Sequence, residues 1–130
     1  MRGATVFVVD DDPGIVDAVT AVLEIDGYRV EGASDSREAL LAVLREPPDV
    51  LVLDVNMPGL NGWELCDILR RQTTTADVPV LFLTGRGEVR DQITAMQVGG
   101  SDHLRKPFRA EELRGKVRAL TASVRRKGRS

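Results

Sequence analysis

Polar residues lie at the ends of the apolar, strand-like runs in this chain. They are Asp10-Asp11, Asp54, Thr84 and Lys106. In a sheet of parallel strands all the carboxyl ends lie along one edge, and ligands bind there, where the strand order reverses. The sequence therefore predicts that three acids, one hydroxyl and one ammonium meet in a single pocket.

Strand and helix signals alternate along the chain. Apolar, β-branched runs predict strands over residues 5–9, 28–33, 49–54, 78–84 and 102–105. Helical spacing and capping residues predict helices from Pro13 to Gly27, from 34–36 to Pro47, from the loop at 55–62 to about Arg71, over 89–98, and from Ala110 to about Arg125. Five strands alternating with five helices predict an α/β fold, a doubly wound parallel sheet with right-handed crossovers.

Length and composition fit one globular domain. Of the 130 residues, 42% are hydrophobic and 29% are charged, and no apolar run approaches the length of a membrane span. Cys66 is the only cysteine, which excludes an internal disulfide and a metal site built on thiolates. The N-terminus is expected to run straight into the first strand, without a signal peptide. These features predict a cytoplasmic protein.

Positive charge is concentrated near the C-terminal end. Residues 1–104 carry 8 basic and 18 acidic side chains, whereas residues 105–130 carry 10 basic and 2 acidic ones. A solvated last helix and tail explain this distribution, and an arm for an acidic partner or nucleic acid is the alternative. Aromatic residues make up only 4% of the chain, so we expect no direct nucleic-acid binding. The expected domain covers 1–124, and 125–130 is a disordered tail or the start of a linker.

The three acids predict a cation site. If their strands are neighbours, Asp10, Asp11 and Asp54 converge, and each close pair of like charges costs about 4 kcal/mol at an effective dielectric near 20. Either some of these acids are protonated or a cation lies among them. Oxygen ligands select Mg²⁺ or Mn²⁺ over zinc. The alternative is that Asp10 and Asp11 only cap the following helix, as we expect of Asp12.

Thr84 and Lys106 point to phosphoryl chemistry. A carboxylate can act as the nucleophile in phosphoryl transfer, which gives an aspartyl phosphate. Catalysis of such a transfer consists mainly of positioning and charge neutralisation. The cation, the Lys106 ammonium and the Thr84 hydroxyl would each cover one phosphoryl oxygen. Taken singly, Thr84 could be an ordinary strand-end residue and Lys106 a solvated charge.

Together these motifs resemble a known family. They are Val8-Val9-Asp10-Asp11, Leu53-Asp54 with Met57-Pro58-Gly59 and Asn61-Gly62, Pro79-Val80 to Leu83-Thr84, and Lys106-Pro107-Phe108. In order and spacing they are similar to those of the receiver domain of two-component response regulators, over roughly residues 4 to 124. The resemblance implies a flavodoxin-like sheet with the strand order 2-1-3-4-5.

The resemblance also implies roles for site residues. Asp54 would accept a phosphoryl group from a phosphohistidine of a sensor histidine kinase or phosphotransfer protein. Asp11, Asp54 and the main-chain carbonyl of Asn56 would bind Mg²⁺, and Asp10 would act through water. The domain would be a phospho-acceptor switch that at most catalyses its own phosphorylation and dephosphorylation. The Lys106–Pro107 peptide bond would be cis.

A switch is implied as well. Thr84 would turn toward the phosphoryl group and shift the face formed by 89–98, 102–105 and 110–125. An effector domain, a downstream protein or a second copy of the chain, in a phosphorylation-dependent dimer, would read this face. The family usually has an aromatic residue three positions before the lysine, where this chain has His103. His103 is either a surface histidine with no special role or part of a weaker or pH-sensitive switch.

Two other functions fit parts of the pattern. A receiver-like interaction module would never take phosphate, but it would be expected to lack Asp54, Lys106 or the acid pair. A Mg²⁺-dependent phosphatase with an aspartyl nucleophile usually needs a second acid two positions later. After Asp54 that position is Asn56, which cannot donate a proton, and after Asp10 it is Asp12, but a cap domain is missing.

Overall fold

The computed structural model describes residues 3–85, 97 and 101–128. The elements in chain order are β1 (Thr5–Val9), α1 (Pro13–Ile25), β2 (Arg29–Ala33), α2 (Ser36–Arg45), β3 (Val50–Asp54), α3 (Gly62–Arg70), β4 (Val80–Thr84), β5 (Asp102–Arg105) and α5 (Ala110–Gly128). Of the helix predicted over 89–98, only residue 97 is among the described residues, so this prediction lies otherwise outside them.

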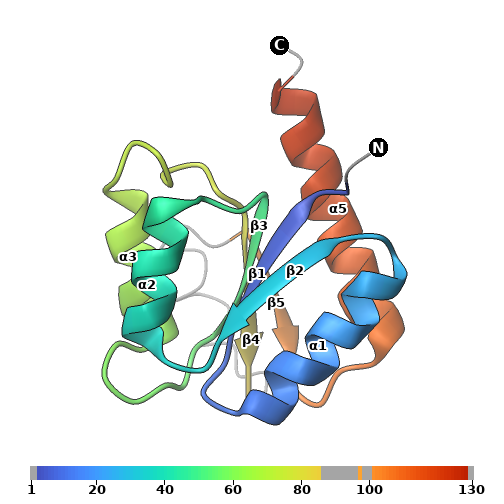
Figure 1. The fold of residues 1–130 in the computed structure, drawn as a ribbon, viewed down its shortest axis with the longest axis horizontal. Helices are drawn as coiled ribbons and strands as arrows, with labels where there is room; N and C mark the ends of the chain where they lie inside the picture. The colour runs from blue at the N-terminus through green and yellow to red at the C-terminus, as the bar shows by residue number, and fades with distance from the viewer. Residues whose placement is uncertain (1–2, 86–96, 98–100, 129–130) are drawn as a thin grey trace.

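The strands form one parallel sheet in the order β2-β1-β3-β4-β5, which confirms the predicted flavodoxin-like arrangement. Helices α1 and α5 cover one face and α2 and α3 cover the other (Figure 1). Strand β3 pairs in parallel with β1, on the side opposite to β2, so the order of the strands reverses here. The carboxyl ends of β1 and β3 therefore lie side by side. This is the position at which the sequence predicts a pocket.

The two middle strands form the centre of the core. Every residue of β3 and β4 is buried, as expected for parallel strands covered on both faces. Leu51 and Leu53 face α2 and α3, whereas Val50 and Val52 face α1 and α5. The edge strand β2 is mostly exposed. The strands that carry Asp54 and Thr84 are therefore fixed in the core by packing on both faces.

Side-chain caps fix where the helices begin. Asp12 caps α1 by accepting a hydrogen bond from the Gly14 N–H at 2.9 Å, as predicted. Asn61 and Glu64 form a reciprocal capping box at α3. These caps set the helices at the carboxyl edge of the sheet, directly after the strands that carry the acids.

Several predicted strands begin too early. Strand β2 begins at Arg29 because the Tyr28 N–H still bonds to the Leu23 carbonyl at the end of α1. Strand β3 begins at Val50, and β4 begins at Val80 because the Val78 N–H donates to Thr75 in a turn. Apolar residues continue past the ladder, so composition alone places these boundaries wrongly.

Helix α5 continues to Gly128, past its predicted end at about Arg125. Residues 125–128, expected in a disordered tail or the start of a linker, are therefore helical, and a linker that begins here stays a prediction. Arginine and lysine are good helix formers, and positive charge is favourable at a helix C-terminus. The helix extends beyond the amino edge of the sheet (Figure 1). Among the described residues, we find no helix with the length and apolar character needed to cross a membrane.

Candidate functional site

Three carboxylates meet at the carboxyl edge of β1 and β3. Asp10 and Asp11 directly follow β1, Asp54 ends β3, and one carboxylate oxygen from each lies within 4.8 Å of the others. Asp10 is fully buried and Asp54 is 4% exposed, whereas Asp11 is exposed. The structure therefore brings the predicted acids together, with one of them open to solvent.

Lys106 reaches this group from the loop after β5. Its Nζ lies 2.7 Å from Asp10 Oδ2 and 3.3 Å from Asp54 Oδ1. Its backbone N–H donates to the Thr84 carbonyl at 2.7 Å, and the Lys106–Pro107 peptide bond is cis, as the resemblance implied. One ammonium thus bridges two of the three acids.

Burial and like charge control the ionisation of Asp54. Burial, together with the Asp10 charge, raises the pKa of Asp54 from 3.8 to about 6, against the opposing effects of Lys106 and the Asn56 N–H. Burial lowers the pKa of Lys106, but its hydrogen bond to Asp10 and the charge of Asp54 outweigh this effect and raise it. Lys106 therefore stays protonated, and one positive charge faces three acids. The negative charge of the three acids thus exceeds the single positive charge of Lys106, and a bound cation would reduce this excess.

The acids differ in how their oxygens are used. Asp10 Oδ2 bonds to Lys106, and its Oδ1 accepts from the Asp12 N–H at 3.0 Å. Asp54 Oδ1 accepts from Lys106 and, at 3.4 Å, from the Asn56 N–H. Both oxygens of Asp10 are thus held by the protein, whereas Asp54 has an oxygen for which the described residues show no hydrogen bond.

Thr84 ends β4 beside the site. Its side chain is fully buried, and its hydroxyl has no hydrogen-bond partner among the residues that the structure describes. A buried polar group without a partner costs about 1–3 kcal/mol, so native proteins keep few of them. The hydroxyl is therefore a donor held without a partner near the cluster.

His103 lies on β5, in register with Phe82 of β4. Its side chain is 32% exposed, and its Nδ1 is 4.0 Å from Asp102 Oδ1. The other carboxylate oxygen of Asp102 bonds to Lys116 of α5 at 3.0 Å. Within the described part of the chain no hydrogen bond joins His103 to Thr84, so the proposed switch pair stays a prediction.

Gly62 is a site residue that sequence reasoning missed. It is buried at the first turn of α3, and a Cβ at this position would collide with the Asp54 carbonyl oxygen. Only glycine lets α3 begin this close to the end of β3. In the sequence the Asn61-Gly62 pair indicates a loop and is part of the family pattern, but it gives no packing role to Gly62, although a glycine directly after a helix cap is a recognisable sign of close approach.

Comparisons with known proteins agree with this geometry. The family model for the response regulator receiver domain matches residues 6–118. The DNA-binding dual master transcriptional regulator RpaA of Synechocystis is 41% identical over 88% of this chain, and the response regulator MprA of Mycobacterium leprae is 44% identical over 88%. The chain covers 48% and 50% of these two relatives, about half of their length.

Solved structures show the same fold. A putative response regulator from Chloroflexus aurantiacus is 35% identical, with a TM-score of 0.89 over 93% of this chain and 99% of that one. The chemotaxis response regulator CheY4 of Vibrio cholerae is also 35% identical, with a TM-score of 0.86 over 90% and 98%.

Proposed function

The chain belongs to the family of response regulator receiver domains, and on this basis we propose that it is a switch in which Asp54 accepts a phosphoryl group. Receiver domains are signalling switches and not conventional enzymes. The observation that carries the proposal is the juxtaposition of a nearly buried Asp54 with Lys106 and two further acids.

Asp54 supplies the nucleophile. A carboxylate oxygen attacks the phosphorus of a phosphohistidine, the phosphorus–nitrogen bond breaks, and the imidazole leaves with its electron pair. Reaction needs the ionised carboxylate; the pKa of Asp54 is raised to about 6 but still lies below 7, so most of the carboxylate is ionised at pH 7. Lys106 lies near enough to donate to an oxygen of the transferred group.

A Mg²⁺ ion bound at the three acids would neutralise negative charge on the phosphoryl oxygens. The donor set fits this ion, because carboxylate oxygens are hard ligands and Asp11 is exposed. Asp11, Asp54 and the main-chain carbonyl of Asn56 would bind it directly. Asp10 would act through water, because Lys106 and the Asp12 N–H already occupy both of its oxygens.

Thr84 would carry the signal. A phosphoryl group on Asp54 offers the acceptor that the buried Thr84 hydroxyl lacks among the described residues, so phosphorylation favours a conformation in which they meet. His103 would respond to this movement on the neighbouring strand. The change would be read on the face formed by residues 89–98, β5 and α5.

The partners follow from this role. A sensor histidine kinase or a histidine phosphotransfer protein would supply the phosphoryl group in the cytoplasm. An effector domain or downstream protein would read the switch, and a phosphorylation-dependent dimer would do so through the same face. RpaA is named as a DNA-binding regulator, and in a longer protein of that kind a separate domain would bind DNA.

The test uses acetyl phosphate and Mg²⁺ with intact-protein mass spectrometry. The wild type should gain one phosphoryl group, and Asp54→Ala should gain none. Asp67→Asn is the matched control, because Asp67 is an exposed aspartate on α3 away from the cluster; it should be phosphorylated like the wild type. A wild type that never gains phosphate would indicate an interaction module, and turnover of added phosphomonoesters would indicate an enzyme.

A further inference from the structure

Strand β2 has an outer edge that no described strand covers. It pairs only with β1, and it lies at the front of the sheet between α1 and α2 in Figure 1. The Arg29 N–H donates to the Ala4 carbonyl beside β1. Because backbone groups alternate between the two sides of a strand, those of Val30 and Gly32 point outward. This edge offers backbone donors and acceptors to another strand.

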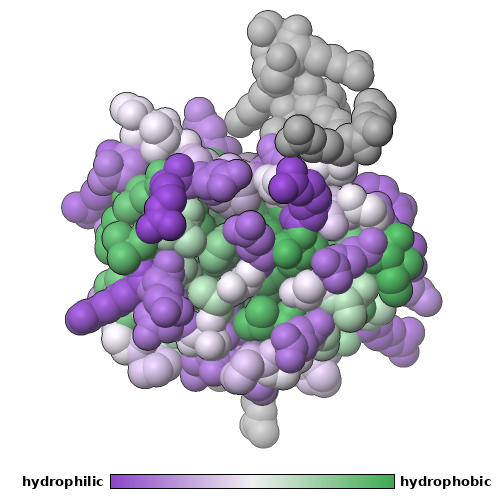
Figure 2. Space-filling model, viewed as in Figure 1, coloured by the Kyte–Doolittle hydropathy of each residue, from purple (hydrophilic) through white to green (hydrophobic). Residues whose placement is uncertain are grey.

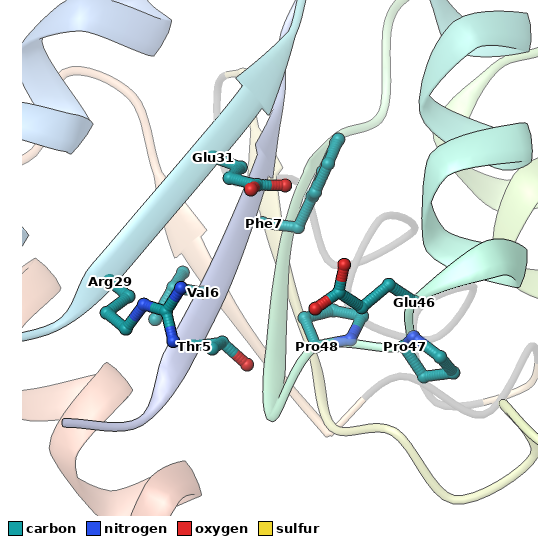
Figure 3. Close-up of a pocket in the computed structure, with 8 residues that line it drawn as sticks. All are labelled: Thr5, Val6, Phe7, Arg29, Glu31, Glu46, Pro47 and Pro48. Atoms are coloured by element: carbon teal, nitrogen blue, oxygen red, sulfur yellow. The ribbon is translucent and has the colours of Figure 1, made fainter. Parts of the chain in front are cut away.

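Two opposite charges flank Val30 on this edge. Arg29 and Glu31 are both exposed, and neither has an ion-pair partner within the described part of the chain. Being two residues apart, they point to the same face of the sheet. Their side chains line a hollow of about 60 Å³ together with Glu46. Figure 3 shows the Glu46 carboxylate on the other side of this hollow.

We propose that β2 pairs in antiparallel fashion with β2 of a second copy of this chain, centred on Val30. In that register the two Val30 residues exchange both backbone hydrogen bonds. Arg29 of each copy then lies opposite Glu31 of the other, because the order Arg-Val-Glu is its own charge complement when read backwards. The contact is the same patch on both subunits, as two-fold symmetry requires.

The hollow strengthens the charge pairing. The partner's Arg29 would extend over the face that carries Glu31, where Glu46 provides a second carboxylate at the same hollow. Charged side chains on an edge strand can also prevent pairing with another chain. Like charges that lie directly opposite each other are destabilising, whereas opposite charges attract. Here the order of the charges attracts a second copy.

The interface is small and polar, so the dimer forms reversibly at high protein concentration. Figure 2 shows hydrophilic and hydrophobic residues interspersed on this side of the molecule. The β2–β2 interface involves neither Asp54 nor β5, so it is separate from the phosphorylation-dependent face proposed above. Unphosphorylated protein without Mg²⁺ is expected to form it.

Charge reversal tests the register. In sedimentation velocity over a concentration series, Arg29→Glu or Glu31→Arg alone should weaken dimerisation by about tenfold or more, because like charges then face each other twice. The double variant Arg29→Glu/Glu31→Arg should dimerise like the wild type. An equal mixture of the two single variants should form the heterodimer. Arg37→Glu and Glu38→Arg, exposed on α2, are the charge-matched controls and should have no effect.

Hydrogen exchange tests which edge is covered. The Val30 and Gly32 amides should exchange more slowly as the protein concentration rises. Asp54→Ala should dimerise and protect these amides like the wild type, whether or not Asp54 takes phosphate. A wild type that stays monomeric throughout the series overturns the proposal. So does a dimer that both single reversals leave intact, or one that leaves these two amides unprotected.

Discussion

The two ends of strand β3 carry aspartates in opposite situations. At the amino end, Asp49 accepts from the Thr5 N–H at 2.8 Å and the Thr5 hydroxyl at 3.2 Å, and its own N–H donates back to the Thr5 hydroxyl at 3.1 Å. At the carboxyl end, Asp54 lies beside Asp10, and burial raises its pKa. The acid at the amino end stabilises the fold. At the carboxyl end the repulsion between buried acids destabilises it, and a bound cation would reduce this repulsion.

The difference teaches how a rigid sheet supports a reactive edge. The amino edge satisfies its polar groups with the protein's own donors, which holds β1 and β3 in register. The carboxyl edge then keeps its acids close because the strands cannot separate. Three pairs of substitutions, described in order of decreasing effect, would break or sharpen this comparison.

The largest expected effect comes from Lys106→Met. This change removes the only ammonium that bonds to Asp10 and Asp54 within the described residues, and leaves both carboxylates buried. Breaking a buried ion pair on one side costs about 3 kcal/mol or more. We expect the free energy of unfolding at pH 7, measured with urea in EDTA, to fall by that amount.

Lys116→Met is the matched control for this change. Lys116 forms an ion pair with Asp102, but both side chains are about one-third exposed, so its loss should cost less than about 1 kcal/mol. Equal losses in the two variants would show that the carboxyl edge is not under special electrostatic stress. Added Mg²⁺ should restore part of the stability of Lys106→Met, since a cation can replace the ammonium.

Aspartate-to-asparagine substitutions at the two ends of β3 should change the free energy of unfolding in opposite directions. The folded-state pKa of Asp54 is raised from 3.8 to about 6, so the fold disfavours the ionised form and stability falls as the pH rises from about 4 through 6. Asp54→Asn removes this penalty and should stabilise the protein by about 2 kcal/mol at pH 7.5. The gain should disappear below pH 4.

Asp49→Asn should instead destabilise the protein by about 1 kcal/mol, because hydrogen bonds to a charged acceptor are stronger than those to a neutral one. Urea unfolding of both variants at pH 7.5 and pH 4 gives the comparison. Destabilisation by Asp54→Asn at pH 7.5 would contradict the electrostatic account of the site.

The sequence predicted the site better than it predicted the boundaries of the elements. Apolar runs that end in polar residues indicate which strand ends carry the site, so the sequence predicts that Asp10, Asp11, Asp54 and Lys106 meet if their strands are neighbours, as they do in the structure. The strand order itself followed from family resemblance, since alternating strands and helices fit more than one parallel arrangement.

Other features depend on contacts that the sequence does not display. The Lys106 bond to Asp10 joins residues 96 positions apart, and whether a lysine bonds to acids or waits in solvent depends on the loop between β5 and α5. The start of β3 depends on the clamp between Thr5 and Asp49, which no local pattern marks. The Lys106 contact and the start of β3 thus depend on hydrogen bonds between residues far apart in the sequence, whereas the starts of β2 and β4 depend on local turns.

The smallest expected effect separates two buried threonines. Thr75 and Thr84 are both fully buried, but the Thr75 hydroxyl donates to the Leu69 carbonyl at 2.6 Å, whereas that of Thr84 has no partner in the described residues. Valine has nearly the same shape as threonine and lacks the hydroxyl. Thr75→Val should therefore lower the free energy of unfolding by about 1 kcal/mol, and Thr84→Val should raise it by a similar amount.

Thermal unfolding of the two unphosphorylated variants measures this difference. If Thr84→Val destabilises the protein as much as Thr75→Val does, the Thr84 hydroxyl already has a partner in solution, and it is not held in reserve for a phosphoryl group. If Thr84→Val stabilises the protein while Thr75→Val destabilises it, the Thr84 hydroxyl has no hydrogen-bond partner in the unphosphorylated protein. Phosphorylated Asp54 would then be the acceptor for this hydroxyl, and Thr84→Val should lose the structural response to phosphorylation while keeping the phosphoryl group itself.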